Sequence, residues 1–149
     1  MTLDKGRPSI WFLGPWNHAS GLGEAARGAL RTLWSMSAEL DVEAEGFAHF
    51  GLHERIGPHQ HCIGNSNHSE TTLSWLHCNP DGTSSSLTSD QKHRLRKSRY
   101  VVATWAWESQ QLPASWHQAL NWIDQLWVPS NYVQNLMQPY TSKTVHVVP

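Results

Sequence analysis

The chain has 149 residues, enough for one domain with its own buried core, and a formal net charge of -1. A nearly neutral chain argues against nucleic acid as a partner, because that binding rests largely on Lys and Arg neutralising phosphates. No apolar run has signal-peptide character or the ~18 residues that cross a bilayer, so we expect a cytoplasmic protein, with the inner face of the membrane as an open alternative.

The first elements predict a strand, a glycine-rich loop and a helix. An apolar run at residues 9–13 indicates a buried strand, and the loop that follows leads through Gly21 and Gly23 into a helix ending near residue 37. Ser20 stands where a helix N-cap is expected. Strand, glycine-rich turn and helix is how α/β proteins present backbone N–H groups to an anion, so this loop is expected to receive a phosphate or a sugar hydroxyl. The predicted apolar face of the helix comprises Leu22, Ala25, Ala26, Ala29, Leu30 and Leu33.

Strands and helices then alternate to the end of the chain. Residues 48–69 have no apolar period and predict a long loop, and the turn signal at residues 79–82 ends a strand. The basic run at residues 92–99 predicts a solvated helical face, with a membrane or nucleic-acid patch as the alternative. Further strands are predicted at residues 41–47, 71–78, 100–107, 123–128 and 144–148, and further helices at residues 87–98, at 113–122 and from Pro129-Ser130 onwards with Tyr132, Val133, Leu136 and Met137 on one face.

This alternation predicts an α/β, Rossmann-like, doubly wound parallel sheet in a single domain, residues 1–149. Ligand sites in such sheets lie outside the carboxyl ends of the strands. Those ends carry the glycine loop, residues 77–81, residues 105–108 and residues 129–130. Glycine, amide, carboxylate and indole groups are therefore expected to converge on one edge of the sheet.

A dinucleotide-binding enzyme is one alternative. Residues 21–26 match the dinucleotide fingerprint with Ala at its third position, and Asp41 and Glu43 follow at about the distance of a ribose contact. However, the fingerprint glycine should follow the strand directly, whereas residues 15–20 intervene here. Glu24 would repel a phosphate if it pointed into the site, although a carboxylate there also complements the helix dipole.

Other candidate groups are weaker. The histidines lack the helical spacing of a zinc enzyme, so no metal site is expected, and His77 is interpreted as a buried histidine with its hydrogen bonds satisfied. Glu108 is a lone carboxylate with no second one near it, which does not favour a paired-carboxylate hydrolase. The nine tryptophans are interpreted as core residues, with carbohydrate stacking as the alternative for Trp16, Trp105 and Trp107. The histidines considered are His49, His53, His59, His61, His68 and His77, with Cys62.

With these junctions in place, the chain resembles the N-terminal half of GT-B glycosyltransferases of the family 4 (glycosyltransferase group 1) type. The matching segments occur in the order of that family and cover nearly the whole chain. They are GPWNHASGLGEAAR at residues 14–27, NPD at 79–81, YVVATWAWE at 100–108, WVPS at 127–130 and VHVVP at 145–149.

The resemblance implies a retaining transfer of a sugar from a nucleotide-sugar, the co-substrate, to a glycan or lipid-linked acceptor, with no other cofactor. It places the donor-phosphate loop at Ser20, Gly21, Leu22 and Gly23. It places acceptor contacts at Asn17, Asn79, Asp81, Trp107 and Glu108. The catalytic base stays unassigned, with Glu108 as a candidate, because many members carry a histidine where this chain has Trp107-Glu108.

The family passes into a second Rossmann-like domain at the point where this sequence ends, Pro149. We therefore expect an acceptor-side domain that is inactive alone and is completed by a C-terminal domain or a partner chain. Peripheral membrane association stays open as an alternative, as does self-association through an exposed apolar patch. A non-catalytic module that binds a carbohydrate or a protein through the same edge is the main alternative function.

Overall fold

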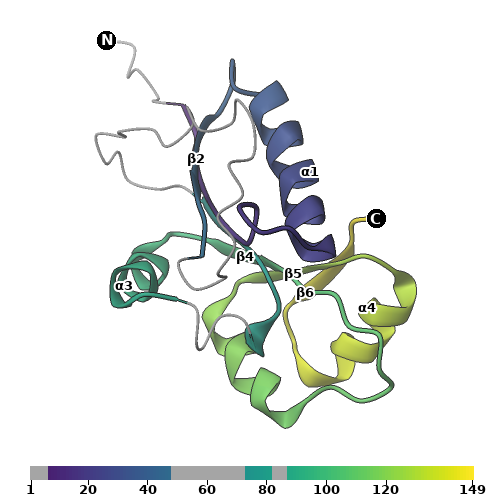
Figure 1. Ribbon diagram of the computed structural model, residues 1–149. Helices are drawn as coiled ribbons and strands as arrows, with labels where there is room; N and C mark the ends of the chain where they lie inside the picture. Colours follow the sequence, from purple (N-terminus) through teal and green to yellow (C-terminus); the bar gives the residue numbers. More distant parts are fainter. Residues whose placement is uncertain (1–6, 48–72, 82–86) are drawn as a thin grey trace.

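The computed structural model describes residues 7–47, 73–81 and 87–149, and within them it confirms the α/β Rossmann-like fold (Figure 1). Six parallel strands form one sheet in the order β2-β1-β3-β4-β5-β6. The strands are β1 (Ser9–Leu13), β2 (Asp41–Glu45), β3 (Leu73–His77), β4 (Val101–Thr104), β5 (Gln125–Val128) and β6 (Thr144–Val147). The predicted loop at residues 48–69 lies outside the described residues.

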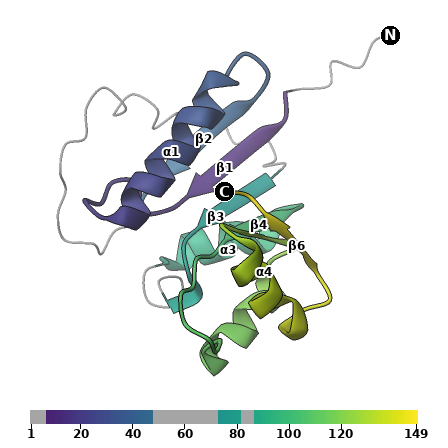
Figure 2. The ribbon, with the colours of Figure 1, turned by 90° about the vertical axis from the view of Figure 1, so that its right-hand side faces the viewer.

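Helices cover both faces of this sheet. The helix α1 packs on one face through Ala26, Leu30 and Leu33, beside β1 and β2 (Figure 2). The other three longer helices share an apolar cluster on the opposite face, through Leu95, Trp116 and Val133 among others. The helices are α1 (Gly21–Ser35), α3 (Ser89–Lys97), the 3-10 helix η2 (Ala114–Trp122), α4 (Asn131–Met137) and the short 3-10 helix η3 (Gln138–Tyr140). None of the described helices is long and apolar enough to span a membrane.

Side chains alternate between the two cores along each strand. In β1, Trp11 and Leu13 face the side of α3, whereas Phe12 faces α1. All three are fully buried, as expected for a strand of a parallel sheet covered on both faces. Trp75 of β3 lies on the α1 side, where its ring packs edge-on against Phe12 at 5.2 Å.

Polar caps determine where the helices begin. Ser20 and Ser130 accept hydrogen bonds from the backbone N–H groups of Gly23 and Val133, respectively. Thr88 forms a capping box with Gln91, because the Thr88 hydroxyl accepts from the Gln91 N–H and the Gln91 side chain accepts from the Thr88 N–H. Each cap satisfies N–H groups that have no partner inside the helix.

One part of the basic run faces inward, contrary to the sequence prediction of a solvated helical face. The Arg94 guanidinium makes two hydrogen bonds to the Glu43 carboxylate, of 2.6 and 2.5 Å, and lies 4.3 Å from the ring centre of Trp11. Gln91 also donates to Glu45, at 2.6 Å. Helix α3 is therefore fastened to β1 and β2 by a half-buried polar network, while Arg96, Lys97 and Arg99 on the same run are exposed.

The predicted strand at residues 100–107 was too long. The strand β4 ends at Thr104. Just after it, the Ala106 N–H donates to the side-chain oxygen of Asn79 at 2.9 Å instead of to a neighbouring strand, so the strand pairing does not continue. The strands β2 and β5 are also shorter than predicted, and the helix that begins after Pro113 is a 3-10 helix. The helix predicted to end near residue 37 ends at Ser35.

Two residues assigned to the apolar face of α1 are exposed. Leu22 is 45% exposed, and Ala25 also faces solvent. The first turn of α1 buries Gly23 against the preceding loop, which turns Leu22 outward. On α4, Val133 and Met137 are buried, whereas Tyr132 is 52% exposed. In both helices, the apolar pattern of the sequence therefore includes residues that lie outside the face packed on the sheet.

Candidate functional site

The chain changes direction in the sheet at β1. Helix α1 leads from β1 to β2 on one side, and β3 pairs with β1 on the other side. The loops that follow β1 and β3 therefore leave the same edge and diverge, and this topological switch point is where open α/β sheets bind ligands. We call this region of the edge the switch-point crevice, after the place where such sheets bind ligands; it comprises residues 14–20, the first turn of α1 and residues 77–81.

Gly14 permits the close approach of the two strands at this edge. A Cβ atom on Gly14 would lie 3.0 Å from the backbone oxygen of His77 and 3.1 Å from its Cβ atom. The Gly14 N–H donates to the Glu45 carbonyl at 3.2 Å, which extends the pairing with β2 by one residue. Between the ends of β1 and β3 there is thus little room for a side chain at Gly14.

Arg27 holds the loop after β1 against α1. Its Nη1 donates to the carbonyl oxygens of Trp16 and His18, at 3.0 and 2.9 Å, while Nε and Nη2 bind Glu24. Hydrogen bonds from Arg27 and then Arg31 lower the pKa of Glu24, so this carboxylate is ionised at neutral pH with two cations beside it. The repulsion of a phosphate that an unpaired Glu24 would exert is thereby reduced.

The two glycines at the start of α1 differ in their surroundings. A Cβ on Gly23 would lie 2.0 Å from the His18 carbonyl oxygen, and its N–H already donates to Ser20 Oγ at 3.1 Å. A Cβ on Gly21 would meet nothing within 4 Å. Within the described residues, the N–H groups of Gly21 and Leu22 have no acceptor. Ser20 and Gly23 therefore shape the turn, whereas Gly21 and Leu22 offer the N–H groups that an anion can reach.

Three buried polar atoms, two in the loop after β1 and one at the end of β3, have no hydrogen-bond partner among the described residues. They are the indole Nε1 of Trp16, the amide Oδ1 of Asn17 and the imidazole Nδ1 of His77. The Nδ2 of Asn17 donates to the Phe47 carbonyl at 3.4 Å, so only its oxygen is unpaired. Because buried polar groups are nearly always hydrogen-bonded, each of these atoms is a candidate partner for a bound water or a ligand group.

His77 is buried as expected, but its Nδ1 has no hydrogen-bond partner in the described part of the chain, so the expectation of a fully satisfied side chain is wrong. The residue is 8% exposed, and its ring centre lies 5.7 Å from that of Phe12 and 6.0 Å from that of Trp75. Burial lowers the pKa of His77, so the imidazole is neutral at pH 7 and can either donate or accept one hydrogen bond at Nδ1.

The loop after β3 is joined to the loop after β4 by Asn79, whose Oδ1 accepts from the Ala106 N–H. Cys78 between them is buried, and burial together with the Asp81 charge raises the pKa of its thiol far above the ordinary range. A thiol of that kind is not a nucleophile at neutral pH. The Asn79 side chain therefore links the two loops, and Asp81 is an exposed charged residue next to them.

Trp107 and Glu108 lie one strand further along the same edge, after β4. The Trp107 indole donates to the Gln111 carbonyl at 2.9 Å, and its ring centre lies 4.6 Å from that of Trp116. Glu108 is exposed, and Trp105 is 1% exposed in the core, where its ring cannot stack on a sugar. Asn17 thus packs against Gly46 and Phe47 beyond the end of β2, His77 lies at the end of β3, and Trp107 and Glu108 follow β4.

Arg27 and Gly14 are the site residues that the sequence did not single out. An arginine in the second turn of a helix carries no sequence signal that it will bind loop carbonyls. Gly14 stood in the glycine-rich loop, but its contact with His77 depends on the pairing of β1 with β3. Both residues act through long-range structure, which local patterns do not encode.

Among the described residues, no group of three or more His, Cys, Asp and Glu side chains could hold a metal ion. The histidines His49, His53, His59, His61 and His68, with Cys62, lie outside those residues. Comparison of the sequence with protein-family models and with curated proteins finds no match.

Proposed function

We propose that this chain is the acceptor-side domain of a GT-B glycosyltransferase, which binds a sugar acceptor and part of a nucleotide-sugar in the switch-point crevice. The observation that carries the proposal is that two kinds of polar group without partners occur at the ends of β1 and β3. The N–H groups of Gly21 and Leu22 suit a phosphate, and the unpaired atoms of Trp16, Asn17 and His77 suit hydroxyl groups. A nucleotide-sugar and its acceptor carry both chemistries.

On the donor side, the phosphate would lie against the N-terminus of α1. Its charge is favoured there by the helix dipole and by the two N–H groups that lack acceptors. Ser20 and Gly23 keep the turn in shape, and Arg27 holds the loop carbonyls away from the phosphate by binding them. The family resemblance places the donor-phosphate loop at Ser20, Gly21, Leu22 and Gly23, and of these Gly21 and Leu22 have N–H groups without an acceptor among the described residues.

On the acceptor side, Asn17 offers an acceptor atom and neutral His77 either a donor or an acceptor. Asp81, in a helical turn that begins at Pro80 after β3, and Glu108, in the loop after β4, are exposed carboxylates. These groups suit a polyhydroxylated ligand, since each sugar hydroxyl both donates and accepts. The catalytic base stays unassigned, with Glu108 as a candidate.

The crevice residues include few cations that could stabilise the negative charge that develops on a departing nucleotide. Arg27, the arginine of the first turns of α1, already binds Trp16, His18 and Glu24. Stabilisation of that charge would therefore come from a second domain or a partner chain facing this edge, and the chain alone would not transfer sugar. Leu22 and Val148 are 45% and 44% exposed, and both belong to segments at this edge, where such a partner would cover them.

The dinucleotide alternative is less well supported. Asp41 is the first residue of β2 and so lies at the amino end of the strand, away from a ribose at the carboxyl edge. The Glu43 carboxylate is bound by Arg94 on the side of α3. A binding module without catalysis is the second candidate, and the same crevice would serve it.

Calorimetric titration of the chain with UDP-sugars, GDP-sugars and NAD tests the proposal. We expect weak, millimolar binding of a nucleotide-sugar, because the phosphate would meet two backbone N–H groups while Arg27 is already bound to Glu24 and the loop carbonyls. We expect no tighter binding of NAD. A micromolar dissociation constant for NAD, about -8 kcal/mol, would contradict the proposal. Micromolar binding of a nucleotide-sugar by the chain alone would show that the donor site does not depend on a second domain.

A further inference from the structure

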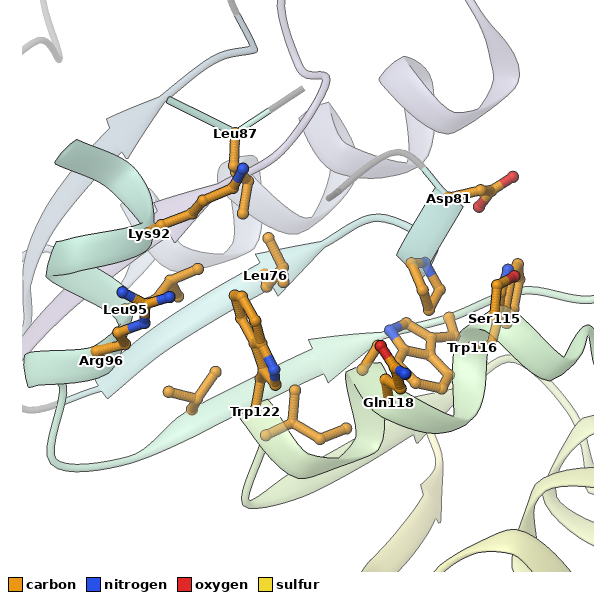
Figure 3. Close-up of a pocket in the computed structure, with 15 residues that line it drawn as sticks. Leu76, Asp81, Leu87, Lys92, Leu95, Arg96, Ser115, Trp116, Gln118 and Trp122 are labelled. Carbon is orange, nitrogen blue, oxygen red and sulfur yellow. The ribbon is translucent and has the colours of Figure 1, made fainter. Parts of the chain in front are cut away.

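A cavity of about 350 Å³ lies on the sheet face opposite α1, away from the glycine loop (Figure 3). Helix α3 forms one side with Leu95 and Arg96, and η2 forms the other with Ala119 and Trp122. Its floor is the sheet, at Leu76 and Val101. Its volume is within the ~300–1,000 Å³ of small-molecule sites.

The lining of the cavity is mainly apolar. Leu76, Leu95, Val101 and Ile123 are each at most 6% exposed, yet all four contribute to its walls. Protein cores are packed to the density of organic crystals, so a space of this size between two helices and a sheet is not ordinary core packing. An apolar group of a ligand would complete these contacts.

The charged groups of the cavity are separated along its length. Lys92 and Arg96 stand at the side of α3, and Asp81 stands at the far end, as Figure 3 shows. A ligand with one negative group would therefore place it on the α3 side, at Arg96. The cavity is therefore cationic at the α3 side and apolar in its interior.

Arg96 is positioned to bind an oxyanion. Its guanidinium carbon lies 5.5 Å from the ring centre of Trp122, a cation–π distance, and Trp122 is 49% exposed. Contact with the indole restricts the side chain while the N–H groups at the edge of the guanidinium remain able to donate to two oxygens of a phosphate or carboxylate. The large exposed indole also offers apolar surface for the first part of a chain attached to that anion.

We propose that this cavity binds a single amphiphilic molecule, with its apolar chain between α3 and η2 and its anionic head group on Arg96. The proposal does not depend on the glycosyltransferase function. It uses a different face of the sheet from the unpaired atoms of the crevice, and only Pro80 and Asp81 belong to both sites.

The test is calorimetric titration with decyl phosphate kept below its micelle concentration, with decyl maltoside and inorganic phosphate as the neutral and headgroup-only probes. We expect saturable one-to-one binding of decyl phosphate and at least about tenfold weaker binding of decyl maltoside, since a charge-assisted hydrogen bond is lost. Inorganic phosphate should not bind at the cavity, because it has no apolar part.

Matched variants locate the site. Arg96→Gln should weaken decyl phosphate binding about tenfold. Lys97→Gln, an exposed residue of the same helix that does not line the cavity, removes the same charge and should leave the affinity unchanged. Ala119→Phe should fill the cavity and abolish binding, with circular dichroism showing that the fold is kept. If Ala119→Phe does not fold, the comparison of Arg96→Gln with Lys97→Gln still decides.

Three results would overturn the proposal. One is the absence of saturable binding of decyl phosphate. Another is an equal loss of affinity in Arg96→Gln and Lys97→Gln, which would indicate attraction by surface charge. The third is binding to vesicles of anionic phospholipid without binding to monomeric decyl phosphate, which would indicate adsorption to a membrane surface.

Discussion

Gly14 lies against the backbone of His77, so that a Cβ on Gly14 would stand 3.0 Å from the His77 carbonyl oxygen. This contact joins the ends of β1 and β3 at the point where the sheet changes direction. It brings a glycine-rich loop and a buried, neutral imidazole to the same crevice. The proposed site therefore depends on a backbone approach that only glycine allows.

The first prediction concerns this contact. Gly14→Ala should lower the free energy of unfolding by about 1–3 kcal/mol, because the methyl group must push the two strand ends apart. Gly28→Ala is the matched control, since a Cβ there meets only the end of the Arg31 side chain at 3.8 Å. It should raise stability by up to about 1 kcal/mol through helix propensity. Urea unfolding of both variants checks the prediction, and equal effects would contradict it.

The second prediction separates the two glycines at the start of α1. Gly23→Ala should destabilise by about 3 kcal/mol or more, because its methyl would collide with the His18 carbonyl, a backbone group. Gly21→Ala should change stability by less than about 0.5 kcal/mol, since open space surrounds its position. Thermal unfolding of the two variants provides the comparison. A stable Gly23→Ala variant would show that the loop is not packed as described.

The third prediction uses the lowered pKa of His77. The folded imidazole binds a proton less readily than the unfolded one, whose ordinary pKa is about 6.5. The contribution of this residue to stability is therefore fully present above that pH and falls as the pH drops below it. His77→Leu should flatten this part of the pH profile, whereas His93→Gln, on the exposed side of α3, should not. An unchanged profile in His77→Leu would show that the ring is not desolvated.

The fold followed from the sequence because its signals were local. Apolar runs, Pro129-Ser130 and the Asn79-Pro80 turn each mark an element boundary within a few residues, and alternation of strands and helices indicates a parallel sheet. The sequence could not show that β4 ends at Thr104. That end depends on Asn79, which is distant from Ala106 in the sequence and accepts a hydrogen bond from the Ala106 N–H.

The site was predicted less completely than the fold. The strand-end rule led to Asn17, Asn79 and the glycine loop, because the carboxyl edge of a parallel sheet can be read from the order of its elements. The contacts of Arg94 with Trp11 and Glu43 could not be predicted from the sequence. The basic residues of that run differ only in their position around the helix, and the sequence does not say which position faces the sheet. The cavity between α3 and η2 likewise depends on how two helices pack, which periodicity does not determine.

The central claim is that the N–H groups of Gly21 and Leu22 bind the phosphate of a nucleotide-sugar. Amide chemical shifts measured by NMR during titration with UDP- and GDP-sugars test it most directly. We predict that the largest shifts occur at Gly21 and Leu22, that Gly21→Val removes them, and that Gly28→Val, further along the same helix, retains them. Shifts that are absent from the first turn of α1, or that persist in Gly21→Val, would contradict the claim.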